Sequence, residues 1–135
     1  MAEKAESFRR RVAFSETDAS GRVHFTEMLK WAEDAEHQTL EGIGVSVCSG
    51  ESGWPRVKVE CDYRHPLFFG EEVEVVLQLS ELGRSSLRWS FQVLNQEGVL
   101  AAEGKMVTVA VTSEGAQEIS AGARQALEGL LNKGG

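Results

Sequence analysis

The sequence predicts an α+β layer fold in which one long helix packs on a mostly antiparallel sheet. Apolar residues recur every three or four positions from Phe25 to Ile43, as they do along one face of an α-helix. After Pro55, apolar and polar residues alternate, which is the pattern of strands with one buried face. A helix stripe and a one-sided sheet bury each other's apolar surfaces when they stack as two layers.

The expected order is one strand, the long helix and four further strands. Phe8, Val12 and Phe14 alternate loosely with polar residues and predict the first strand. The helix runs for about five turns and is expected to end at Gly42 or Gly44. The later strands are expected over residues 57–63, 73–79, 87–93 and 99–111, with Gly104 interrupting the last of them. Residues 45–55 are expected to form a loop, and residues 121–131 a terminal helix or tail.

Length and charge bound the class of protein. A chain of 135 residues is expected to form a single domain, with a core over about residues 8–115 and a helix or tail over 116–135. This size buries enough surface that neither a disulfide nor a metal is needed for stability. The formal net charge of −7 argues against nucleic acid or an anionic membrane as the partner.

The cysteines and the apolar runs favour a soluble, cytoplasmic protein. Cys48 and Cys61 lack the spacing of metal ligands, and Cys61 is expected to be a small core residue. Cysteine usage of this kind fits a reducing compartment. The sequence shows no apolar signal segment and no stretch long enough to span a membrane.

Asp18 is the principal catalytic candidate because it lies in a polar turn between the first strand and the long helix. The first N–H groups of a helix have no intrahelical acceptor and carry partial positive charge. A carboxylate at such a junction can act on water or on a carbonyl carbon, while the free amides hold the developing oxyanion. The same aspartate would also suit a simple turn or capping role.

Four short motifs follow one another across about residues 8–115. They are Glu16-Thr17-Asp18-Ala19-Ser20-Gly21-Arg22-Val23-His24-Phe25, Trp31-Ala32-Glu33-Asp34-Ala35, Tyr63-Arg64-His65-Pro66 with Phe69-Gly70-Glu71, and Gly83-Arg84-Ser85-Ser86. In this order they resemble the motifs of hotdog-fold acyl-CoA thioesterases of the 4-hydroxybenzoyl-CoA thioesterase branch. The resemblance implies a hotdog fold, with a long central helix packed on a curved five-stranded sheet.

The resemblance also implies roles for individual residues. Asp18 matches the catalytic carboxylate, a nucleophile or general base, and the backbone amide of Phe25 matches the group that polarises the thioester carbonyl. Arg84, Ser85 and Ser86 match positions that often touch the nucleotide end of CoA. The implied reaction converts an acyl-CoA and water to a free acid and CoA, with no metal or redox cofactor. Such proteins join their sheets edge to edge as homodimers or homotetramers, with active sites at the subunit interface.

His24 and Glu27, which both follow Asp18, depart from the family pattern and are expected to line the substrate pocket. His24 stands where Tyr or Trp is usual, and Glu27 lies in an atypical Thr26-Glu27-Met28 segment. Both would also suit ordinary first-turn roles, Glu27 through the helix dipole. An alternative pairs His24 with Asp18 as the acid and base of a hydratase or dehydratase. Another alternative is a non-catalytic acyl-CoA or acyl-carrier binding protein.

Two expectations concern the strands. The apolar run 107–111 in the last strand is expected to be the sheet edge that a second copy covers. Arg56, Lys58, Arg64 and Arg88 are interpreted as strand-surface charges. Acyl length and the choice between aromatic and aliphatic substrates are left open by the sequence.

Overall fold

The computed structural model describes residues 5–48, 50 and 52–131, and it contains the expected elements. The main strands are β1 (Glu6–Arg11), β2 (Arg56–Tyr63), β3 (Glu72–Leu82), β4 (Ser86–Leu94) and β5 (Leu100–Val109). The helices are α1 (Phe25–Gly42) and α2 (Ala121–Leu131), with a short 3-10 turn, η1 (Phe14–Glu16), before α1. A small ribbon of β6 (Val111–Thr112) and β7 (Gly115–Ala116) follows β5. The predicted loop 45–55 includes residues 49 and 51, which lie outside the described residues.

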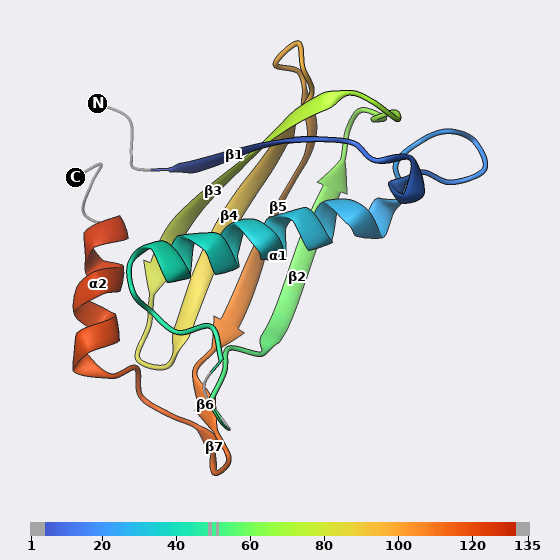
Figure 1. Cartoon of the computed structure of the whole chain (residues 1–135). Coiled ribbons are helices and arrows are strands. Elements are labelled where there is room, and N and C mark those ends of the chain that lie inside the picture. The colour runs from blue at the N-terminus through green and yellow to red at the C-terminus, as the bar shows by residue number, and fades with distance from the viewer. Residues whose placement is uncertain (1–4, 49, 51, 132–135) are drawn as a thin grey trace.

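The strands form one antiparallel sheet in the order β1-β3-β4-β5-β2, and α1 crosses one face of it (Figure 1). Alternate side chains of β3 and β4 point toward α1 and are buried, as the period of two predicted. Trp31, Ala32 and Leu40 supply part of the helix side of this core, and α2 adds Leu127 beside β3. The arrangement is the one that the resemblance to hotdog proteins implied.

The first strand is shorter than the sequence predicted. β1 ends at Arg11, and Phe14 lies in η1 with its side chain exposed. Val12 leaves the strand but stays fully buried, because its N–H and C=O bond to Glu71 and Gly70 of the β2–β3 loop. The alternation of apolar residues in the sequence therefore continues beyond the last residue of β1 that pairs with β3, which is why the strand was predicted too long.

The prediction that the last strand is the sheet edge is wrong. β5 lies between β4 and β2 and is hydrogen-bonded on both sides, so its apolar run is internal. The free edges are β1 and β2. An apolar run is typical of an interior strand as well as of a covered edge, and only the strand order distinguishes the two.

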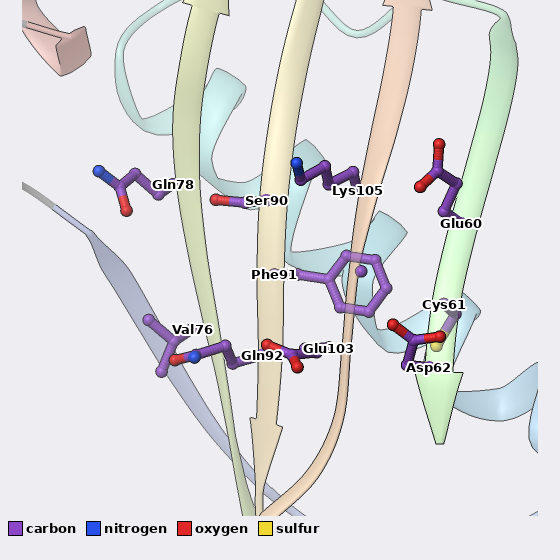
Figure 2. A pocket seen from close by; sticks show the side chains of 11 residues that line it. Glu60, Cys61, Asp62, Val76, Gln78, Ser90, Phe91, Gln92, Glu103 and Lys105 are labelled. Carbon is purple, nitrogen blue, oxygen red and sulfur yellow. The ribbon is translucent and has the colours of Figure 1, made fainter. Parts of the chain in front are cut away.

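Gly104 lies inside β5 rather than interrupting it. A Cβ at this position would meet the Glu60 carbonyl oxygen of β2 and would lie 2.7 Å from Cζ of Phe91. Figure 2 shows the Phe91 ring extending from β4 across β5. The glycine therefore makes room for an aromatic ring within the sheet.

The sheet face away from α1 is polar. Gln78, Ser90, Lys105 and Glu60 form one row across four strands, beside a second row of Val76, Gln92, Glu103 and Asp62 (Figure 2). These residues line a shallow hollow of ≈ 340 Å³. None of the site residues predicted from the sequence lies there.

Arg56 is not a surface charge, in contrast to the expectation from the sequence. Its side chain is only 18% exposed and reaches from the start of β2 to α1. One guanidinium nitrogen lies 2.6 Å from Oε1 of Glu36, and the other lies 3.0 Å from Oε2 of Glu33. Glu36 is fully buried, and burial raises the pKa of its carboxyl despite this partner. The ion pair therefore joins the edge strand to the helix inside the core.

Arg56→Met is expected to destabilise the fold by about 3 kcal/mol or more, because it leaves the Glu36 carboxylate buried without a partner. Chemical denaturation followed by circular dichroism measures this loss. Lys58→Met is the control, since Lys58 pairs with Glu60 only at the surface and its loss is expected to cost under about 1 kcal/mol. The double variant Arg56→Met/Glu36→Leu should recover most of the stability. Equal stability of the parent and Arg56→Met would contradict the importance of the pair.

Candidate active site

The Asp18 loop is closed by hydrogen bonds between its two ends, directly before α1. Thr17 and Val23 form a β-bridge, and the Asp18 N–H donates to the Arg22 carbonyl at 2.7 Å. Gly21 adopts φ 86° within the loop, a conformation that favours glycine. Asp18 therefore stays beside the helix start, at the junction that the sequence predicted.

The Asp18 carboxylate is exposed and bonded within its own loop. Its Oδ1 accepts from the N–H of Ser20 at 2.8 Å and from the Ser20 hydroxyl at 2.5 Å. These hydrogen bonds lower the pKa of the Asp18 carboxyl below its ordinary value. The group is therefore a carboxylate at neutral pH, which a nucleophile or a base requires.

Phe25 is the first residue of α1, so its N–H lacks an intrahelical acceptor. The residue before it, His24, is the N-cap: its Nδ1 accepts from the Thr26 N–H at 3.3 Å. The rings of His24 and Phe25 stack at 4.8 Å. His24 thus has an ordinary capping role in this structure, with its ring beside that of Phe25.

Glu16 organises this junction, which the sequence did not indicate. Its carboxylate accepts from the Trp31 indole at 3.1 Å and from the Ala13 N–H at 2.8 Å, and it pairs with Arg10 at 2.6 Å. Its backbone carbonyl accepts from the His24 N–H at 2.9 Å. One residue therefore connects β1, η1 and the first turn of α1. In the sequence Glu16 was only the first residue of the Asp18 motif, and that position carries no information about its hydrogen-bond partners.

An apolar cleft of ≈ 410 Å³ opens beside the first turn of α1. It is lined by Arg22, Val23, Phe25, Met28, Tyr63, Arg64, His65, Pro66 and Leu67. Phe25 is 58% exposed, and its ring meets that of Tyr63 edge to face at 6.2 Å. Asp18 does not line the cleft, but its N–H bonds to Arg22, which does. The cleft can take an apolar group next to the free amide of the helix.

Tyr63 was part of a motif but was not assigned a role from the sequence. Its hydroxyl donates to the Phe25 carbonyl at 2.8 Å. Partial burial, together with the neighbouring Cys61, raises the pKa of Tyr63 to about 12. The phenol is therefore protonated, and able to donate, throughout the neutral range.

Cys61, which the sequence placed in the core, is half-buried on the edge strand β2.

The remaining predicted residues lie apart from the cleft. Glu27 is in the first turn of α1 and pairs with Lys30 at 3.3 Å. Arg84, Ser85 and Ser86 form the β3–β4 hairpin, at the other end of the sheet from the Asp18 loop (Figure 1). There the Arg84 and Ser85 carbonyls bond to Ile119 and Ala110. Within one chain the structure does not bring the hairpin and Asp18 together.

Residues 5–48, 50 and 52–131 contain no group of three or more His, Cys, Asp or Glu that could hold a metal ion. No helix in the same ranges is long and apolar enough to cross a membrane.

A long helix packed across one face of a five-stranded antiparallel sheet is the architecture of hotdog proteins. The model of the thioesterase-like superfamily matches residues 12–127, and the chain belongs to this family. This confirms the resemblance seen in the motifs, the hotdog fold and, at the level of the family, the expectation of a thioester hydrolase.

Several named proteins are similar to this chain. A 1,4-dihydroxy-2-naphthoyl-CoA hydrolase of Synechococcus elongatus is 30% identical over 102 residues, which are 71% of this chain and 75% of the relative. The crystal structure of protein TT1821 from Thermus thermophilus has a TM-score of 0.85 at 33% identity, covering 92% of this chain and 98% of that one. The gentisyl-coenzyme A thioesterase BH1999 has a TM-score of 0.83 at 27% identity, covering 90% and 98%.

Proposed function

We propose that the protein is an acyl-CoA thioesterase in which Asp18 attacks the thioester carbonyl or activates water, and the Phe25 amide polarises the carbonyl. The observation that carries the proposal is the closure of the Asp18 loop directly before the start of α1, beside an apolar cleft. The loop supplies a negative charge, and the helix start supplies an unpaired donor. These are the two groups that acyl transfer to water requires.

The lowered pKa of Asp18 bears on its role. A low pKa keeps Asp18 deprotonated, which both proposed roles, nucleophile and general base, require. As a nucleophile, Asp18 would form an acyl anhydride and release the CoA thiolate, and water would then hydrolyse the anhydride to the free acid. His24 caps the helix through Nδ1 and does not itself line the cleft, but its ring stacks on that of Phe25, which does.

The acyl group is proposed to be aromatic. Phe25 and Tyr63 present two ring surfaces in the cleft, and aromatic groups pack favourably edge to face against such rings. Two relatives are named for aromatic acyl groups, a dihydroxynaphthoyl-CoA and gentisyl-CoA. CoA itself is part of the substrate in this proposal, and no metal or redox cofactor takes part.

Release of thiol from a panel of acyl-CoAs tests the activity. Benzoyl-type thioesters are expected to give higher kcat/KM than straight-chain acyl-CoAs of similar size. A preference for straight chains would contradict the aromatic assignment alone. Binding of all of them without thiol release would contradict hydrolysis and leave an acyl-CoA binding protein.

The working unit is proposed to be a homodimer joined through β2, or a tetramer of such dimers. β2 is a free edge, and it exposes Val57 (60%) and Val59 (41%) as well as Tyr63. The Tyr63 end of β2 lies at the Asp18 junction, whereas its Arg56 end lies level with the 84–86 hairpin. A two-fold axis that pairs β2 with β2 antiparallel would set the Asp18 junction of one copy beside the hairpin of the other. That geometry would unite the predicted catalytic and CoA-contacting residues in one site.

Light scattering at micromolar concentration is expected to show a dimer or larger assembly. Val59→Lys should shift the protein toward monomer, because it places a charge on the β2 edge. Val99→Lys is the matched control, since Val99 is 42% exposed but lies outside β2. A stable monomer for the parent chain would contradict the shared site.

A further inference from the structure

We infer that Tyr63 is a positioning residue for the Phe25 amide, and that its hydroxyl fixes the direction in which that N–H points. The inference rests on the proposed role of the amide in polarising the thioester carbonyl. The observation that supports it is the hydrogen bond from the Tyr63 hydroxyl to the Phe25 carbonyl at 2.8 Å. A side chain of the edge strand thereby holds the first turn of α1.

The first turn of a helix needs such a tether when its amide has a catalytic task. Early N–H groups lack helical acceptors, so the start of a helix frays more readily than its middle. The orientation of the Phe25 N–H depends on the His24–Phe25 peptide plane. A shift of about 1 Å at a reacting group can cost about a hundredfold in rate.

The two peptide planes that flank this amide are both held. On one side, the His24 N–H donates to the Glu16 carbonyl, and Glu16 is anchored by Trp31. On the other side, the Phe25 carbonyl accepts from Tyr63. The plane between them carries the Phe25 N–H, and its own carbonyl, that of His24, accepts from the Glu27 N–H at 2.9 Å, so Tyr63 completes a set of restraints on this plane and its neighbours.

Tyr63 is well placed to act as a rigid tether. It pairs with Ala102 in the β2–β5 ladder, so its backbone belongs to the sheet. Its ring also contacts the Phe25 ring edge to face, which limits rotation of both side chains. In an α-helix the Phe25 carbonyl already accepts from the N–H four residues later. The hydrogen bond from the Tyr63 hydroxyl is therefore a second one, and its effect is to fix the orientation of the first turn.

Tyr63→Phe is expected to lower kcat about 10- to 100-fold and to change KM by less than about threefold. The ring and the cleft wall remain, while the tether is lost. Ser80→Ala is the matched control, because the Ser80 hydroxyl donates to the Arg88 carbonyl at 3.0 Å on β3, away from the cleft. It should leave kcat unchanged. A parent-like kcat for a folded Tyr63→Phe overturns the inference.

A double-variant cycle tests whether Tyr63 acts through the amide. In the Phe25→Ala background, which keeps the N–H, Tyr63→Phe should retain its 10- to 100-fold effect. In the Phe25→Pro background, which lacks the N–H, the further loss should be less than about threefold. Equal losses in both backgrounds overturn the inference but leave the amide role intact. Equal turnover of the two single Phe25 variants rejects the amide role itself, and the inference with it.

Discussion

The Asp18→Asn variant is expected to lower the turnover of an acyl-CoA by at least about a hundredfold. The amide has the size of the carboxylate, but it is neither a base nor a nucleophile. Its oxygen can still accept the hydrogen bonds from the Ser20 N–H and hydroxyl, so the loop should keep its shape. Turnover measured beside a thermal melting curve separates lost chemistry from lost fold.

Three comparisons sharpen this result. Asp18→Ala should be equally inactive. Glu16→Gln should be much milder, because Glu16 has no part in the proposed reaction, although the single amide oxygen can accept from only one of the two donors, Trp31 and Ala13, that bind different oxygens of Glu16. Acyl-CoA binding should persist in Asp18→Asn, because in the proposed mechanism this carboxylate acts on the reaction rather than on holding CoA. Parent-like turnover in Asp18→Asn would reject the proposed mechanism and leave the family membership unaffected.

Phe25→Pro is expected to lower turnover by about two to three orders of magnitude, the usual cost of losing one oxyanion donor. Proline removes only the N–H from the backbone and is well tolerated at the first position of a helix. His24 has φ −64° and ψ 138°, which is the extended conformation that a residue before proline requires. The variant is therefore expected to fold.

Phe25→Ala is the matched control, because it removes the same ring and keeps the N–H. It should retain part of the activity, with the loss appearing mainly in KM for aromatic substrates. Steady-state kinetics on one aromatic acyl-CoA measure both variants. Equal turnover of folded Ala and Pro variants would contradict the role of the amide.

Local patterns in the sequence were sufficient to predict the long helix and the main strands, but not η1, β6 or β7. The three- and four-residue spacing of apolar residues predicted α1, and the period of two predicted β2 to β5. These patterns work because each reflects the geometry of a single element against a single buried face. The position of Asp18 between a strand and a helix was determined in the same way, since both neighbours are adjacent in sequence.

The tertiary structure alone decided which strand is the edge, which charge is buried and what holds the first turn of α1. β5 became an interior strand and β2 a free edge, because strand order depends on long-range pairing that no local pattern records. Arg56 became an internal ion-pair partner only because Glu36 lies across from it on α1. Tyr63 meets Phe25 across 38 positions of the chain. Periodicity assigns a residue to a face, but a specific partner is fixed only when two distant elements pack together.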